Sequence, residues 1–145
     1  MSPGEIYRKW FAEVWNAKRS DRMAAFVTDD ALFHTAAMDG APVRGPSGFA
    51  PMFDTLVAAF PDIDFQVQNV IESGDFAAGH WVATMTHTGE GMGVKPTGRP
   101  LTIAGMAIIR CADGKVVECW DQWDKLGLLT GIGAVAAVGQ SELQS

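Results

Sequence analysis

The stretch from residue 100 to residue 124 reads PLTIAGMAIIRCADGKVVECWDQWD, and it decides the fold. Two apolar runs that contain β-branched residues flank Asp113-Gly114. This dipeptide between alternating apolar residues is the strongest short-range signal for a β-hairpin. We therefore expect two long antiparallel strands that meet at this turn.

The register of the hairpin decides which side chains share a face with Asp121. A two-residue loop pairs Asp121 with Met106, whereas a three-residue loop that ends in a glycine bulge pairs it with Gly105 and pairs Ala107 with Cys119. We expect the three-residue loop, because it gathers small and apolar side chains around a single carboxylate. The resulting face is composed of Ile103, Gly105, Ala107, Ile109, Val117, Cys119, Asp121 and Trp123. Because protein interiors are close-packed, small side chains beside a carboxylate suggest a pocket left open for a ligand.

The composition predicts one globular domain over residues 1–145, with a core from about residue 6 to residue 133. Hydrophobic residues make up 48% of the chain and charged residues 19%, and the net charge is −6. A negative charge without a basic stripe argues against nucleic acid and anionic membranes as partners. No stretch has the pattern of a signal peptide or the length of a membrane span, so we expect a cytoplasmic protein. The segment from Gly139 to Ser145 is expected to fray.

The two cysteines are expected to be free thiols. Cys111 and Cys119 lie on opposite arms of the hairpin and are partners in neither register. This predicts a reducing compartment. Because no Cys and His residues have metal-ligand spacing, we expect no metal, and we expect no other cofactor.

Helical periodicity dominates the first part of the chain. Ser2 and Glu5 form a capping box before the first helix, and Ser47 is expected to cap a later one. A short helix between them is expected to end at Asp29-Asp30. The expected helices span residues 2–15, 20–27 and 47–60.

Period-two alternation marks the strands. A short strand from Ala31 to Ala36 contains His34, and longer strands run over residues 64–72 and 76–88 before the hairpin. Residues 126–132 are expected to form a last helical turn. Helices followed by a run of antiparallel strands predict an α+β fold, in which three N-terminal helices cover a curved antiparallel sheet and enclose an apolar pocket.

Several short motifs together resemble the SnoaL-like polyketide cyclases. The resemblance extends from Ile6 to Gly133 and implies the cystatin-like α+β cone or barrel shared with ketosteroid isomerase, scytalone dehydratase and the nuclear transport factor family. The motifs are Asp29-Asp30 with His34, Phe60-Pro61-Asp62, Thr86-His87-Thr88-Gly89, Pro96-Thr97-Gly98-Arg99, Asp113-Gly114-Lys115-Val116, and Trp120 through Leu129.

The resemblance also suggests chemistry. Asp121 matches the aspartate that acts as acid/base in the anthracycline cyclases, which close a ring by intramolecular aldol addition without a cofactor. The chain departs from those enzymes at Ala107, where they have a histidine. The tyrosine and aspartate of ketosteroid isomerase correspond to Phe11 and Thr35, so steroid isomerisation by that pair of residues is not expected.

The candidate catalytic residues are Asp121 and His34. Burial raises the pKa of a carboxyl, so Asp121 is suited to remove a proton next to a carbonyl group. His34 is a candidate donor to the enolate oxygen, or a pocket-rim histidine bonded to the backbone. Tyr7, the only tyrosine, could supply a hydroxyl to the pocket, but a helix-stripe residue is more often part of the core, to which we assign it. Asp124 is assigned a structural role. The candidate substrate-binding residues are Gly105, Ala107, Cys119, Trp123, Trp81, Met85, His87, Phe33 and Phe53.

Three functions remain open. The first is a cofactor-independent cyclase, isomerase or dehydratase that acts on a small apolar molecule containing a carbonyl group. The second is a non-catalytic carrier of such a molecule, which is favoured if no other proton-handling group reaches the pocket near Asp121. The third is a water-adding hydrolase or hydroxylase on the same fold. We also expect a homodimer or higher homo-oligomer, formed through apolar residues on the outer face of the hairpin: Met106, Ile108 and Trp120.

Overall fold

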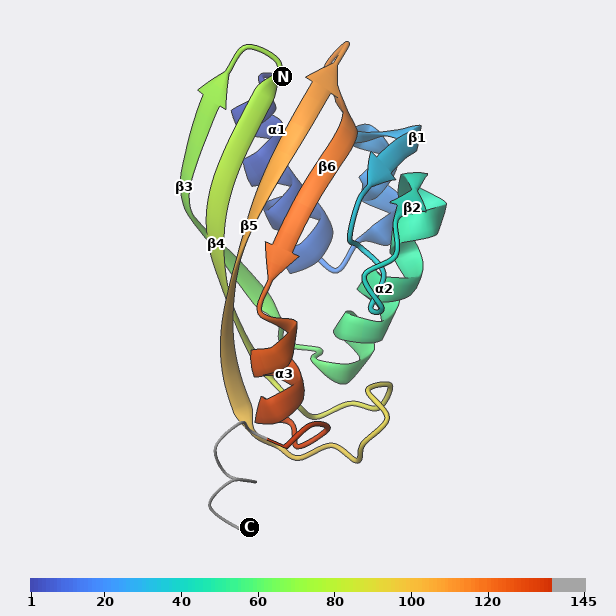
Figure 1. The fold of residues 1–145 in the computed structure, drawn as a ribbon, viewed down its shortest axis with the longest axis vertical. Helices are drawn as coiled ribbons and strands as arrows, with labels where there is room; N and C mark the ends of the chain where they lie inside the picture. The colour runs from blue at the N-terminus through green and yellow to red at the C-terminus, as the bar shows by residue number, and fades with distance from the viewer. Residues whose placement is uncertain (137–145) are drawn as a thin grey trace.

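A six-stranded sheet curls around a layer of helices in the computed structural model of the chain, which describes residues 1–136 (Figure 1). The strand order is β2-β1-β6-β5-β4-β3. Neighbouring strands are antiparallel, except that β1 runs parallel to β6. The predicted α+β fold with a curved sheet is therefore confirmed. The strands are β1 (Val27–Phe33), β2 (Val43–Arg44), β3 (Asp64–Ser73), β4 (Phe76–Thr86), β5 (Pro100–Ala112) and β6 (Lys115–Trp123).

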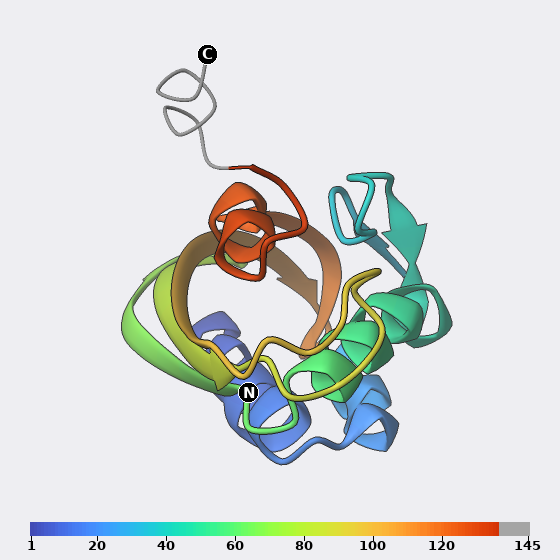
Figure 2. The same cartoon turned by 90° about the horizontal axis from the view of Figure 1, so that it is seen from below.

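The helices close the open side of this sheet. Seen from below, the sheet forms an arc, α1 and α2 lie across its open side, and α3 lies at the end of the sheet nearest the viewer (Figure 2). The first helix changes to π-helical geometry midway. The helical segments are α1 (Pro3–Lys9), η1 (Trp10–Asn16), the 3₁₀ segment η2 (Ser20–Ala25), α2 (Gly45–Ala59) and α3 (Lys125–Gly131). No helix within residues 1–136 is long and apolar enough to cross a membrane.

The N-terminal boundaries differ from the expected ones. Ser2 caps α1 as predicted, since its hydroxyl accepts a hydrogen bond from the Glu5 amide at 3.2 Å. Asp29-Asp30, expected to end a helix, lies instead inside β1. This strand is stabilised by pairing with β6, which is distant in sequence, so local propensity is overridden. Because β1 ends at Phe33, His34 follows the strand rather than lying within it.

The helix α2 begins two residues before the predicted cap, Ser47. Its first residue is Gly45, and no side chain caps it. Gly45 has a positive φ of 66°, and a Cβ atom there would collide with the Asp29 carbonyl oxygen. The close approach of β1 therefore determines where this helix starts.

The hairpin has a different register from the one we expected. Asp113 and Gly114, with φ of 51° and 77°, form a two-residue turn, and Ala112 pairs with Lys115. A bulge then shifts β6 by one residue. Asp121 therefore lies opposite Ala107, and not opposite Gly105.

The expected faces are nevertheless retained, because the observed register differs from the expected one by two residues along the strand. Cys119, Asp121 and Trp123 are therefore on the inner face as predicted. Val117 is the exception, because the bulge turns Val116 inward in its place. On β4 the predicted alternation is also present, with Trp81 and Met85 among the buried residues, and His87, which directly follows the strand, is buried as well.

Aromatic side chains fill most of the space between sheet and helices. Trp15 of η1 contacts Phe53 and Phe65 with ring centroids 4.7 and 4.9 Å apart, and Phe65 contacts Trp81 at 4.9 Å. Each such pair contributes about 0.5–1.5 kcal/mol beyond the burial of its area. Cys111 and Cys119 are buried free thiols. The predicted fraying of residues 139–145 lies outside the described residues.

Candidate active site

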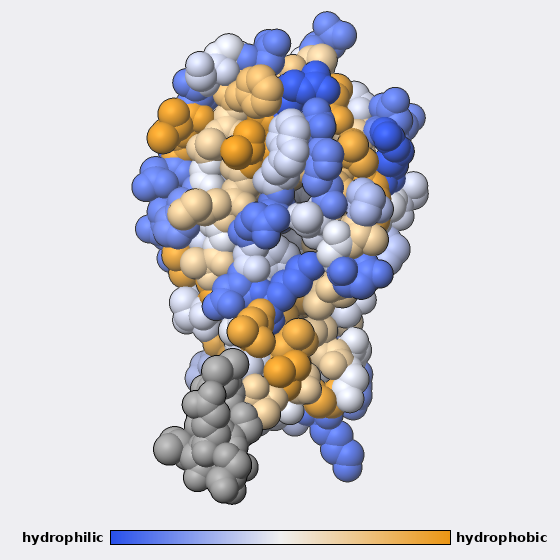
Figure 3. Space-filling view, viewed as in Figure 1, coloured by the Kyte–Doolittle hydropathy of each residue, from blue (hydrophilic) through white to orange (hydrophobic). Residues whose placement is uncertain are grey.

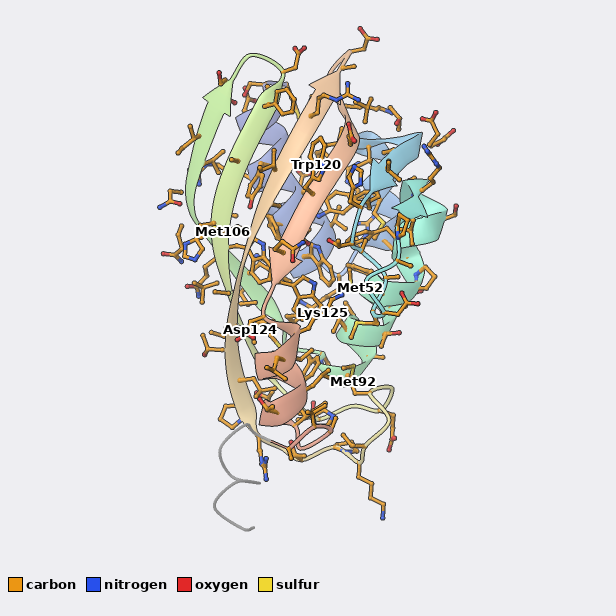
Figure 4. All side chains as sticks on the ribbon, in the orientation of Figure 1. Met52, Met92, Met106, Trp120, Asp124 and Lys125 are labelled. Atoms are coloured by element: carbon orange, nitrogen blue, oxygen red, sulfur yellow. The ribbon has the colours of Figure 1, made fainter. Side chains whose placement is uncertain are left out.

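An apolar pocket lies between the inner face of the sheet and the helices α1, η1 and α2. The volume open to the centres of water-sized molecules is about 60 Å³, which is room for a few waters. A ligand with several rings therefore requires the wall to move. Met52 of α2, which lies on the helix side in Figure 4, is one lining residue with an unbranched side chain that repacks easily.

Most of the predicted substrate-binding residues line this pocket: Phe33, Trp81, Met85, Ala107, Cys119 and Trp123. Gly105, His87 and Phe53 do not. Phe53 lies behind Trp15, with their ring centroids 4.7 Å apart. Gly105 lies beneath two larger side chains, since a Cβ there would overlap the Trp81 indole and meet Cβ of Trp123 at 2.8 Å.

His87 is buried beside the pocket and holds a loop. Its Nδ1 accepts a hydrogen bond from the Thr97 amide at 3.2 Å, and its ring lies 5.4 Å from that of Phe60. Its backbone carbonyl accepts from the Gly98 amide at 2.7 Å. The sequence placed His87 on the inner face, where it is, but contacts with the loop after β4 determine its surroundings.

Asp121 points its carboxylate into the pocket. The residue is partly exposed as a whole, but Oδ1 is buried and has no hydrogen-bond partner within the described part of the chain. Burial raises the pKa of Asp121 to about 7, against the opposing influence of Lys125. The Thr35 hydroxyl donates a hydrogen bond to the backbone carbonyl of Asp121 and so ties the segment after β1 to β6. The carboxyl can therefore exist in both its acid and its base form near neutral pH.

Tyr7, assigned to the core from its place in the helical stripe, is buried in the core and also lines the pocket. Burial, followed by the charges of Asp121 and Cys119, raises the pKa of its hydroxyl. The ring lies over Gly79, where a Cβ atom would overlap it. A glycine at an inward position in the middle of a strand was the available signal, because such glycines mark a close approach of another group.

His34 is not brought to Asp121, which corrects the expected placement. Its Nε2 lies 2.7 Å from Glu118 Oε2, and its ring stacks on Trp120 at 5.0 Å with an interplanar angle of 11°. Glu118 also accepts hydrogen bonds from Arg110 at 3.2 Å. These partners alternate with Asp121 along β5 and β6, so they lie on the outer face of the sheet. The hydrogen bond from His34 is the main cause that lowers the pKa of Glu118.

Two charged residues directly follow β6. Asp124 caps α3 by accepting a hydrogen bond from the Gly127 amide at 2.8 Å, as its structural assignment anticipated. Lys125 donates to the backbone carbonyl of Ala37 at 3.1 Å and lies 5.7 Å from the centre of the Trp123 ring. Both residues are near the end of the strand in Figure 4. Among residues 1–136, no three His, Cys, Asp or Glu side chains gather in a group that could hold a metal ion.

Comparison with known proteins identifies relatives of the same architecture. A family model described as SnoaL-like polyketide cyclase matches residues 5–132. The chain is 28% identical over 138 residues to aklanonic acid methyl ester cyclase DauD of Streptomyces sp. (strain C5), a match that covers 92% of this chain and 83% of that protein.

Solved structures agree with this result. IdmH of Streptomyces antibioticus, provisionally assigned as a polyketide cyclase, is 29% identical with a TM-score of 0.80, over 92% of this chain and 99% of that one. AclR of Streptomyces galilaeus, provisionally assigned as a hydroxylase, is 26% identical with a TM-score of 0.80, over 99% of this chain and 90% of that one. The same fold is thus found in proteins with different assigned reactions.

Proposed function

The chain belongs to the SnoaL-like polyketide cyclase family, and on this premise we propose that it is a cofactor-independent enzyme in which Asp121 transfers protons on an apolar, carbonyl-containing substrate. The observation that carries the proposal is the carboxylate of Asp121, whose Oδ1 is buried in an apolar pocket and whose pKa is raised to about 7. An acid/base catalyst is most effective when its pKa is near the working pH.

The proposed reaction begins with the ionised carboxylate of Asp121, which takes a proton from the carbon next to the carbonyl. The C–H electron pair forms a carbon–carbon double bond, and the carbonyl electron pair moves onto oxygen to give an enolate. In a cyclisation the enolate carbon attacks a second carbonyl of the same molecule, and protonated Asp121 returns its proton to the new alkoxide. If the enolate is conjugated with a second double bond, return of the proton to the far carbon of that system gives an isomerisation. If the carbon next to the enolate carbon carries a hydroxyl group, the carbonyl re-forms and this group leaves as water with the proton from Asp121, which gives a dehydration.

The substrate class follows from the pocket wall and the relatives. Aromatic and methionine side chains line the pocket, and such surfaces suit flat, apolar molecules. The matched relatives DauD and DnrD are named aklanonic acid methyl ester cyclases. We therefore propose a polyketide-derived ketone or keto ester as substrate.

The test is deuterium exchange, because it needs no knowledge of the natural substrate. Incubation with 1-indanone or propiophenone in D₂O should accelerate deuterium incorporation at the carbon next to the carbonyl, as followed by NMR. Both ketones are apolar like the pocket wall, and they require less movement of that wall than a larger polycyclic ligand does. Binding of the ketone with exchange no faster than in buffer would instead support the carrier function and contradict the proposal.

We also propose that the outer face of the sheet pairs with a second copy of the chain. Large apolar side chains are exposed there, among them Ile71, Phe76, Met106 and Ile108. Figure 3 shows hydrophobic side chains among polar ones over the upper part of this face, and Figure 4 labels Met106 and Trp120 on its strands. Exposed apolar patches of this kind commonly mark interfaces.

Light scattering coupled to size exclusion should therefore give a dimer or a higher assembly. Met106→Glu should shift it to a monomer, since a charge would be buried in the interface. Leu126→Glu, at an exposed position on α3, should leave the assembly unchanged. A monomeric parent protein would contradict this proposal.

A further inference from the structure

Three buried polar atoms in the pocket have no hydrogen-bond partner within residues 1–136. They are Tyr7 Oη, Trp81 Nε1 and Asp121 Oδ1, and all three residues line the same cavity. Buried polar groups in native proteins are nearly always hydrogen-bonded, so unpartnered atoms that face one cavity indicate a place for a ligand. The first two are donors, and the third belongs to the proposed acid/base.

The sheet register brings these atoms together around Ala107. Gly79 of β4, Ala107 of β5 and Asp121 of β6 lie side by side in one row across the inner face. Because glycine has no side chain, the Tyr7 ring lies directly over Gly79. The hydroxyl oxygen of Tyr7 would lie only 2.8 Å from a Cβ atom built on Gly79, and Gly79 pairs with Ala107, so this hydroxyl lies next to Ala107.

The second donor, the indole N–H of Trp81, belongs to the next row of paired residues along the strands. Trp81, Gly105 and Trp123 lie side by side there, about 7 Å from the first row. The six-membered ring of the Trp81 indole lies over Gly105. Its Nε1 is bonded directly to one of the ring atoms that approach Gly105, and Trp81 and Ala107 line the same pocket. The two glycines therefore admit two large donor side chains, and Ala107 leaves room between them and Asp121.

A packing role does not explain the hydroxyl of Tyr7. Phenylalanine would fill the same volume without burying a polar atom that lacks a partner. Burial and the charge of Asp121 raise the pKa of the hydroxyl, so it stays protonated and remains a donor at neutral pH.

We propose that the Tyr7 hydroxyl, with the Trp81 indole N–H as a second donor, binds the carbonyl oxygen of the substrate and stabilises the enolate formed when Asp121 removes the neighbouring proton. This rests on the proposed function of Asp121 and adds the catalytic residue whose hydrogen bond stabilises the negative charge that develops on the substrate oxygen. The substrate class is an enolisable aryl ketone or keto ester whose carbonyl oxygen lies over Ala107. The proton moves to Asp121, the negative charge moves to the substrate oxygen, and the Tyr7 proton stays on Tyr7 while donating its hydrogen bond.

The test uses an enolate mimic, so that the contribution of the Tyr7 hydroxyl to binding is measured separately from proton removal by Asp121. The probe is 4-nitrophenol, whose phenolate carries negative charge on an oxygen bound to an aromatic ring and absorbs visible light. Binding is measured in an Asp121→Asn background, where no carboxylate repels the phenolate. Adding Tyr7→Phe should weaken phenolate binding by about tenfold to a hundredfold, the range for a hydrogen bond to a charged group. Binding of neutral nitrobenzene should change less than about threefold, because the ring remains.

Two further measurements exclude a structural explanation. Tyr7→Phe should unfold at the same temperature as the parent protein or higher, because it removes an unpartnered buried atom. Gly79→Ala should also weaken phenolate binding although it keeps the hydroxyl, because the new methyl group displaces the Tyr7 ring. Equal phenolate affinity with tyrosine and phenylalanine, or no phenolate binding by the Asp121→Asn protein, would overturn the assignment. If the parent protein does not accelerate deuterium exchange but phenolate affinity still depends on Tyr7, the proposed role of Asp121 is wrong and the assignment of Tyr7 stands.

Discussion

Replacing Asp121 with Asn is expected to lower turnover by about a hundredfold or more, the usual contribution of a positioned acid/base. The amide has nearly the same shape as the carboxylic acid but cannot accept a proton from carbon. The measurement is the steady-state rate of deuterium exchange into 1-indanone, or of product formation once a substrate is known. The parent rate should rise as the pH increases through about 7, because burial raises the pKa of Asp121 to about 7 and the base is the ionised form.

His34→Gln is the matched control for this experiment. His34 was the second catalytic candidate on sequence grounds, but its ring is bonded to Glu118 and stacked on Trp120 outside the pocket. We expect the turnover of the His34→Gln variant to stay within about twofold of that of the parent protein. Proton transfer requires the catalytic group to be within hydrogen-bond distance of the substrate, and His34 lies outside the pocket. An unchanged rate in Asp121→Asn, or a hundredfold loss in His34→Gln, would refute the assignment of the base.

The same Asp121→Asn substitution is expected to stabilise the protein at pH 8. The pKa of Asp121 is about 7 in the folded protein and 3.8 for the unperturbed group. Below pH 3.8 the carboxyl is protonated in both states, and well above pH 7 it is ionised in both. Between these values only the unfolded state is ionised, so unfolding releases a proton and the free energy of unfolding falls as the pH rises. Across this window Asp121 lowers the stability by up to about 4 kcal/mol, because each unit of pKa difference corresponds to about 1.36 kcal/mol.

Urea denaturation at several pH values tests this prediction. Other titrating groups contribute to both proteins, so the difference between Asp121→Asn and the parent isolates the effect of the carboxyl. That difference should grow in favour of the variant from pH 4 to pH 8 and then level off. Parallel stability profiles would show that Asp121 is solvated in the folded protein, which would also remove the basis for its role as a tuned base. A variant that loses activity and gains stability is typical of a residue retained for function.

Much of the architecture was accessible from local patterns. The alternation in residues 100–124 placed Asp121 on the inner face, and this survived the incorrect register because the error was an even number of residues. The capping of α1 by Ser2 and the inward positions of Trp81 and Met85 on β4 were also predicted, because they depend only on residues close in the sequence. The bulge at Val117 was not predicted, because it arises from how β6 fits between its two neighbours.

Only part of the candidate site could be predicted from the sequence. The sequence indicated Asp121 and most of the apolar wall, but its second catalytic candidate was His34, which does not line the pocket, whereas Tyr7 does. His34 was misplaced because β1 ends at Phe33, three residues before the expected end at Ala36, and because its ring turns to Glu118, a contact between segments far apart in sequence. Tyr7 was underestimated because it fits the apolar stripe of its helix as well as any core residue.

The amino-acid sequence by itself determined the period of each element and therefore the face on which each strand residue lies, since alternation depends only on neighbouring residues. That was sufficient to predict the α+β fold and an inward carboxylate. Only the tertiary structure decided which groups meet that carboxylate. The first helix crosses β4 at Gly79, so Tyr7 reaches the pocket, while the side chain of His34 packs against the outer face of β6. Such contacts depend on where helices cross strands and on the register between strands that are distant in the sequence, and short-range periodicity does not specify either.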